Sequence, residues 1–127
     1  MTPARSFPWI LALAIDVALV VAFAAIGMRS HHGGFTALGL LETAWPFLVG
    51  ALLGWLVARA WRRPARLGTG LLIWFVAAAG GMALRVATGG GFAWSFLIVT
   101  LVVLAALLIG WRAIAALVAR IRARPRT

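Results

Sequence analysis

The stretch FPWILALAIDVALVVAFAAIGM, residues 7–28, decides the fold class. It is apolar along its whole length except for Asp16. A helix crosses the hydrocarbon core of a bilayer with roughly 20 such residues, whereas the apolar part of a signal peptide has about 7–15. Residues 7–28 therefore predict a transmembrane helix that the mature protein retains.

The composition of the chain agrees with a membrane protein. Of its 127 residues 65% are hydrophobic and 11% are charged, and a water-soluble core of this size cannot bury so much apolar surface. Three further apolar segments follow at residues 44–61, 67–88 and 92–114. We predict an all-α membrane domain over residues 1–118, in which four transmembrane helices form two tandem hairpins, and a basic cytoplasmic tail over residues 119–127.

The arginines are distributed unequally between the two ends of these helices. Arg29 and Arg85 belong to one end. The other ten belong to the opposite end: Arg5, Arg59, Arg62, Arg63, Arg66, Arg112, Arg120, Arg122, Arg124 and Arg126. The positive-inside rule then places both termini in the cytoplasm. Tryptophans suited to the membrane interface support the predicted helix ends: Trp9, Trp45, Trp61, Trp94 and Trp111.

The two predicted hairpins share a pattern of glycine and aromatic residues. The matched segments are Gly27-Met28 with Gly81-Met82, residues 44–49 (AWPFLV) with 93–98 (AWSFLI), and Gly54-Trp55 with Gly110-Trp111. We interpret the hairpins as diverged copies in the same orientation, related by an axis along the membrane normal. The alternative is that apolar hairpins of simple composition resemble each other by chance.

Small residues recur at helical spacing in the later apolar segments, a pattern that lets neighbouring helices approach closely. The candidates for helix packing are Pro46, Gly50, Gly54, Ala58, Gly81 and Gly110. Homodimerisation through one of these faces is the alternative.

Asp16 is the sharpest candidate for a polar site inside the membrane. Inserting a carboxylate in the middle of a span costs about 2.5–3.5 kcal/mol, so we expect it to face the other helices and to meet a partner. Arg59 and Arg112 start near the cytoplasmic edge and are the candidate partners. Such a carboxylate either couples the transport of a proton or cation, or pairs with an arginine to hold helices together.

A second polar cluster is expected at the outer end. Its candidate members are Arg29, His31, His32, Glu42 and Arg85. Two adjacent histidines without a third ligand are a weak metal signal, and we predict no metal and no cofactor. A polar lid, an anion site, and a simple ion pair of Glu42 with Arg85 or Arg29 all remain open.

The sequence contains no nucleotide-binding loop, no HExxH helix and no serine nucleophile elbow, so we predict no catalytic residue and no enzyme. We expect the Arg-rich inner face to contact anionic lipid headgroups, with about 1 kcal/mol of attraction for each arginine. We expect no nucleic acid, because the basic tail lacks interleaved aromatic residues.

These features together resemble a known family. Asp16, the exit at residues 27–31, the segment TAWPF at 43–47, and Gly110-Trp111-Arg112 are similar to the small bacterial inner-membrane family called domain of unknown function 3054. The resemblance implies a four-span fold and a multi-pass location in the bacterial cytoplasmic membrane. It implies no activity.

Small multidrug-resistance exporters share part of this pattern. They are similar in length and span number, and they too have one carboxylate in the first span, where proton and substrate compete. Their carboxylate is Glu, however, and their weak charge bias permits antiparallel dimers. The excess of arginine at one end of this chain favours a parallel dimer or an accessory subunit.

Three functions therefore remain as hypotheses. The first is an accessory or assembly subunit of a larger membrane complex. The second is a small oligomeric transporter or channel that uses Asp16 as its coupling carboxylate. The third is a membrane protein that carries a cofactor.

Overall fold

The computed structural model of the chain describes residues 7–29 and 36–123. Its elements are α1 (Trp9–Arg29), α2 (Ala37–Ala58), α3 (Leu67–Ala87), α4 (Trp94–Leu104), the π-helical η1 (Ala105–Ile109) and α5 (Gly110–Ala123). Because α4, η1 and α5 are continuous, they form one span, and the described residues contain four spans that are long and apolar enough to cross a membrane. The prediction of an all-α protein with four transmembrane spans is confirmed.

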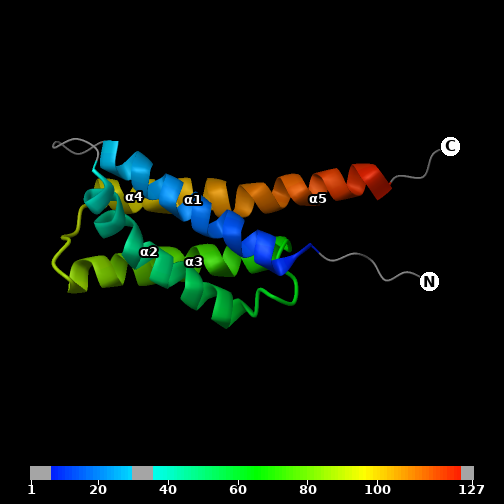
Figure 1. The fold of residues 1–127 in the computed structure, drawn as a ribbon, viewed down its shortest axis with the longest axis horizontal. Helices are drawn as coiled ribbons and strands as arrows, with labels where there is room; N and C mark the ends of the chain where they lie inside the picture. Colours follow the sequence, from blue (N-terminus) through cyan, green and yellow to red (C-terminus); the bar gives the residue numbers. More distant parts are fainter. Residues whose placement is uncertain (1–6, 30–35, 124–127) are drawn as a thin grey trace.

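The four spans lie side by side as a bundle (Figure 1). The second span packs against α1 and α3, and the fourth span, through α4 and η1, also contacts both α1 and α3. The start of α1, the turn between α2 and α3, and the end of α5 lie at one end of the bundle. We call it the Arg-rich end, after the arginines of that turn. Glu42 and Arg85 belong to the opposite end.

The second span begins earlier than the sequence predicted, at Ala37 instead of residue 44. The Thr36 side chain caps this helix by accepting a hydrogen bond of 3.0 Å from the Gly39 amide. The hydroxyl of Thr43 donates to the Gly39 carbonyl at 2.9 Å, so this polar side chain is satisfied within the helix. The helix ends at Ala58 instead of residue 61, because Arg59 adopts a left-handed conformation with φ of 49°.

The fourth span continues further than predicted. Its last helix runs past residue 114 to Ala123, so residues 119–123 of the predicted tail are helical. The reason is that Ala, Leu, Ile and Arg are all compatible with a helix, and arginines on its exposed side do not interrupt the backbone pattern. The run of arginines therefore does not end this helix.

Glycines allow α2 and α3 to pack closely. A Cβ on Gly50 would lie 2.9 Å from the carbonyl oxygen of Ala77, and one on Gly54 would lie 3.0 Å from the Cα of Ile73. A Cβ on Gly81 would overlap the ring of Phe47. The small-residue face of α2, with Pro46 also buried and Ala58 partly buried, is therefore covered by the chain itself. It is not a free surface for a second copy.

Gly110 differs from the other predicted packing residues. A Cβ at this position would meet no atom within 4 Å. The prediction that Gly110 brings two helices together is therefore wrong, because the neighbouring helices leave open space beside it.

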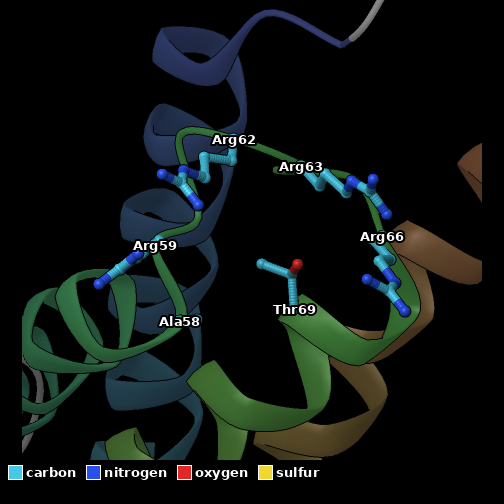
Figure 2. A pocket seen from close by; sticks show the side chains of 6 residues that line it. All are labelled: Ala58, Arg59, Arg62, Arg63, Arg66 and Thr69. Atoms are coloured by element: carbon cyan, nitrogen blue, oxygen red, sulfur yellow. The ribbon is translucent and has the colours of Figure 1, made fainter.

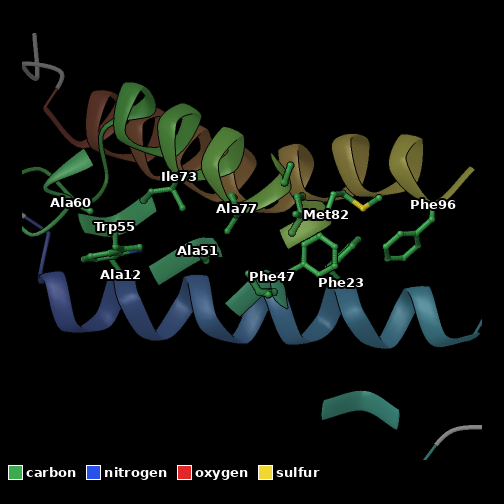
Figure 3. Close-up of a cluster of buried hydrophobic side chains, with 14 residues drawn as sticks. Ala12, Phe23, Phe47, Ala51, Trp55, Ala60, Ile73, Ala77, Met82 and Phe96 are labelled. Atoms are coloured by element: carbon green, nitrogen blue, oxygen red, sulfur yellow. The ribbon is translucent and has the colours of Figure 1, made fainter. Parts of the chain in front are cut away.

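An aromatic cluster fills the half of the core nearer to the opposite end (Figure 3). The ring centroids of Phe23 and Phe47 are 5.1 Å apart, and Phe96 lies 6.0 Å from Phe23 and 5.9 Å from Phe47. These rings come from α1, α2 and α4, so they join three spans through aromatic packing. The other half of the core contains the polar site.

Candidate functional site

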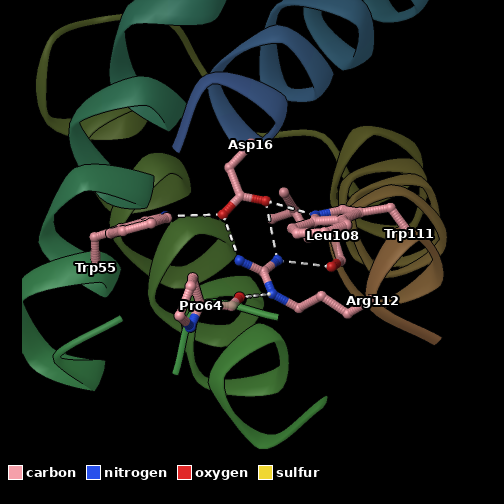
Figure 4. Close-up of polar contacts among 6 residues, drawn as sticks. All are labelled: Asp16, Trp55, Pro64, Leu108, Trp111 and Arg112. Atoms are coloured by element: carbon pink, nitrogen blue, oxygen red, sulfur yellow. Dashed lines mark hydrogen bonds and ion pairs between the residues drawn. The ribbon is translucent and has the colours of Figure 1, made fainter. Parts of the chain in front are cut away.

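Asp16 lies in α1 and faces the interior of the bundle, with 1% of its surface exposed. Its Oδ1 accepts from Arg112 Nη1 at 2.9 Å and from Trp111 Nε1 at 2.9 Å. Its Oδ2 accepts from Arg112 Nη2 at 2.6 Å and from Trp55 Nε1 at 2.8 Å. Figure 4 shows the carboxylate between the two indoles, with the guanidinium on a third side. A carboxylate has about four lone-pair positions, and four donors occupy them.

Arg112 is fully buried and uses further donors on backbone oxygens. Its Nε donates to the carbonyl of Pro64 at 2.8 Å, and its Nη1 donates to the carbonyl of Leu108 at 2.8 Å (Figure 4). Among the described residues, no buried side-chain nitrogen or oxygen lacks a hydrogen-bond partner. The ion pair therefore ties α1, α2, α5 and the α2–α3 turn together. We call this set the Asp16–Arg112 lock: Asp16, Trp55, Pro64, Leu108, Trp111 and Arg112.

The π-helical η1 explains how Arg112 reaches the interior. The buried residues of the fourth span recur every four positions: Phe96, Thr100, Leu104, Leu108 and Arg112. In a regular α-helix this spacing drifts by about 40° at each step, because a turn has 3.6 residues. A π turn contains more residues and so slows the rotation. The wider turn at Ala105–Ile109 keeps Arg112 on the buried face.

A glycine in α3 makes room for the arginine. A Cβ on Gly70 would lie 2.6 Å from Arg112 Cδ and 3.3 Å from the carbonyl oxygen of Leu108. The guanidinium also lies over the ring of Trp111, with its Cζ 4.6 Å from the ring centroid. Gly70 is therefore part of the site although it donates and accepts nothing there.

The structure brings together two of the three residues predicted for this site. Asp16 pairs with Arg112, whereas Arg59 is exposed in the turn after α2 and lines a separate cavity. Sequence reasoning missed Gly70 and the donors Trp55 and Trp111. Both tryptophans match in the internal repeat, and Trp111 was predicted at the membrane interface, but the sequence did not predict that either one donates to Asp16. The carbonyls of Pro64 and Leu108 have no side-chain signal at all.

The predicted cluster at the opposite end is looser. Glu42 and Arg85 line one cavity of about 350 Å³, together with Trp45, Pro46, Thr88, Gly89 and Gly90. Within the described residues they form no ion pair, and Arg85 instead places its Cζ 4.4 Å from the ring centroid of Phe96. Arg29 is the last residue of α1. His31 and His32 lie outside the described residues.

Because four donors already occupy the carboxylate of Asp16, the lock has little capacity for further chemistry. Asp16 lines neither the cavity at Arg59 nor the cavity at Glu42. A substrate or a proton carrier would have to displace an indole or the guanidinium to reach the carboxylate. In the part of the chain that the structure describes, no group of three or more His, Cys, Asp and Glu residues could hold a metal ion.

Comparison with known proteins identifies a family without assigning an activity. No curated protein and no solved structure matches the chain. The family model described as protein of unknown function (DUF3054) matches residues 13–115. The match contains the whole Asp16–Arg112 lock and leaves out the basic tail. This chain therefore belongs to DUF3054, a family described as proteins of unknown function.

Proposed function

We propose that this protein is a non-catalytic accessory or assembly subunit of a larger membrane complex. The observation that carries the proposal is the saturation of Asp16, the carboxylate inside the four-span bundle, by Arg112, Trp55 and Trp111. A coupling carboxylate must exchange protons and meet its substrate, whereas this one is enclosed in a contact between helices. Its role is to hold the spans in one arrangement that a partner can recognise.

The proposal includes an orientation in the bacterial inner membrane, with both termini in the cytoplasm. The distribution of arginines supports it, because the α2–α3 turn and the end of α5 share one end of the bundle (Figure 1). This end would face the cytoplasm and its anionic lipid headgroups.

The proposal also includes duplication of an ancestral hairpin. Two contacts support it: a Cβ on Gly27 would meet Phe96 at 3.4 Å, and a Cβ on Gly81 would meet Phe47. The repeat matches Gly27 with Gly81 and Phe47 with Phe96, so each contact is the image of the other. The matched tryptophans, Trp55 and Trp111, each donate to one oxygen of Asp16. A pseudo-twofold axis near Asp16 would relate the two glycine–phenylalanine contacts to each other, and the two tryptophan hydrogen bonds to each other.

Purification of the full chain from its native membrane in mild detergent, followed by native mass spectrometry, tests the proposal. We expect a defined complex with one stoichiometric protein partner. A homo-oligomer with a bound small molecule, together with proton release on addition of that molecule, would overturn the proposal in favour of a transporter. Asp16→Asn should abolish the proton release in that case, while Glu42→Gln, which removes a carboxylate at the opposite end, serves as the matched control.

The hypothesis of a bound cofactor has its own readout in the same sample. A visible absorbance that His31→Ala or His32→Ala alters would make this chain a cofactor carrier. We expect a colourless protein, because the histidines are adjacent and the sequence offers no third ligand at a defined spacing.

A further inference from the structure

A cavity of about 350 Å³ lies between the end of α2 and the start of α3 at the Arg-rich end. It is lined by Ala58, Arg59, Arg62, Arg63, Arg66 and Thr69. Figure 2 shows the α2–α3 turn curving around the opening, with Thr69 pointing into it from the first turn of α3. We call it the arginine cavity. It is separate from the Asp16–Arg112 lock.

Among the residues that the structure describes, the arginines of this cavity have no acidic partner. The sequence contains two acidic residues, Asp16 and Glu42. Asp16 is saturated by the lock, and Glu42 lines a cavity at the opposite end of the bundle. Four arginines that line one opening concentrate positive charge there, and an anion from outside the chain would neutralise it.

Thr69 adds a hydroxyl to the lining of the arginine cavity. Only 9% of the surface of Thr69 is exposed. Because no buried side-chain oxygen among the described residues lacks a hydrogen-bond partner, a Thr69 hydroxyl without one must be accessible from the cavity that it lines. The hydroxyl is therefore available to donate a hydrogen bond to a polar group in the cavity. The side chain points toward the place where such a group would lie (Figure 2).

The start of α3 contributes further donors. Its N-cap, Arg66, is extended and makes no side-chain hydrogen bond to the helix. The amides of the first turn therefore lack a capping acceptor, and the positive end of the helix dipole favours an anion there. These amides, the hydroxyl of Thr69 and the guanidinium groups are all donors, so the arginine cavity is suited to a ligand rich in acceptor oxygens.

We propose that the arginine cavity binds a phosphate group, carried by a lipid headgroup or by a soluble phosphate compound. Guanidinium groups bind phosphate oxygens in pairs, and hydroxyl and amide donors bind the remaining ones. The volume is at the lower end of the range for small-molecule sites, about 300–1,000 Å³, and holds a phosphate with a small organic group. This site goes beyond the accessory role proposed above and does not depend on it.

The lock holds the wall of the arginine cavity in place. Arg112 Nε donates to the carbonyl of Pro64, which lies in the turn between Arg63 and Arg66. The turn is therefore anchored to the buried ion pair before any ligand arrives. Anchoring lowers the entropy that binding would otherwise cost.

Isothermal titration calorimetry on the full chain in a maltoside detergent, which contains no phosphate, tests the proposal. One titration uses inorganic phosphate and the other uses short-chain phosphatidic acid in the same micelles, both at constant ionic strength. We expect saturable binding of at least one probe. Binding of phosphatidic acid alone identifies a lipid headgroup as the source, and binding of inorganic phosphate identifies a soluble one.

Two variants and a matched control locate the binding. Arg62→Gln with Arg63→Gln should weaken binding by about tenfold or more, since paired guanidinium contacts are strong. Thr69→Val removes only the hydroxyl and should weaken it by about fivefold. Arg120→Gln with Arg122→Gln removes the same charge from exposed positions of α5 and should leave the affinity within about twofold.

The outcomes distinguish a specific binding site from general electrostatic attraction to a basic surface. Equal losses in the cavity variant and in the α5 control would overturn the proposal, because general attraction to a basic surface would then explain the binding. Absence of saturable binding of both probes would overturn it as well. Circular dichroism and the melting temperature of each variant establish that the fold is retained, and Thr69→Val keeps the test valid if the turn variant unfolds.

Discussion

Each of the two acidic residues of this chain lies near an arginine, but only one of them forms an ion pair with it in the described structure. Asp16 and Arg112 are 1% and 0% exposed at their side chains and form an ion pair of 2.6 Å. Glu42 and Arg85 share the lining of an open cavity and form no ion pair. A buried carboxylate has no water to solvate it and needs a partner, whereas an exposed one is solvated and gains little from pairing. Burial, more than proximity, decides which pair forms.

Loss of the arginine should have the largest effect. Arg112→Leu leaves Asp16 buried without its cation, and we expect a loss of about 3–5 kcal/mol in the free energy of unfolding. Reversible unfolding in mixed micelles measures it. The double variant Asp16→Leu with Arg112→Leu removes both charges and should recover much of the loss. A single variant as stable as the wild type would show that the lock does not hold the helices.

Loss of one indole donor should have the next largest effect. Trp55→Phe and Trp111→Phe keep a ring but remove one hydrogen bond to the carboxylate, at a cost of about 1.5–3 kcal/mol each. The same unfolding measurement compares them. Similar losses would agree with equivalent roles in a duplicated hairpin, while no loss in either would mean that Arg112 alone satisfies Asp16.

A methyl group beside the arginine tests the packing around the lock. Gly70→Ala should cost about 1–3 kcal/mol, because its Cβ would lie 2.6 Å from Arg112 Cδ. Gly110→Ala in α5 is the matched control, because a Cβ at this position meets nothing within 4 Å. Alanine has the better helix propensity, so this variant should be as stable as the wild type or more stable. Equal effects of the two changes would contradict this explanation.

The smallest effect is expected at the opposite end. Glu42→Gln should change the unfolding free energy by less than ~0.5 kcal/mol, because the side chain is exposed and unpaired in the described structure. A double-mutant cycle with Arg85→Gln should show no coupling. A coupling as large as that of Asp16 with Arg112 would mean that the two ends of the bundle are stabilised in the same way.

Hydropathy predicted the spans well where a segment is apolar without interruption. Residues 7–28 and 67–88 agree closely with α1 and α3, which the structure places at Trp9–Arg29 and Leu67–Ala87. The start of α2 was missed because Glu42 and Thr43 lower the local hydropathy, although a threonine cap lets the helix begin before them. Backbone capping depends on local hydrogen bonds, and a count of apolar residues does not detect it.

The sequence predicted two candidate partners for Asp16, and the structure identified Arg112 as the partner. Both Arg59 and Arg112 start near the same edge of the membrane, so distance along the helix does not separate them. The choice depends on the wide turn at Ala105–Ile109 and on the space beside Gly70. Neither feature has a signature in one sequence, because each is a relation between neighbouring helices.

The amino-acid sequence by itself determined that this protein is a four-span membrane protein with one carboxylate in its first span. The reason is that partition between water and hydrocarbon depends on composition over about 20 residues and needs no tertiary contact. Only the tertiary structure decided that Arg112 and two indoles donate to Asp16, and that four other arginines line an open cavity. Hydrogen bonds depend on angles and on distances of a few ångströms between helices, and only the packed bundle sets these.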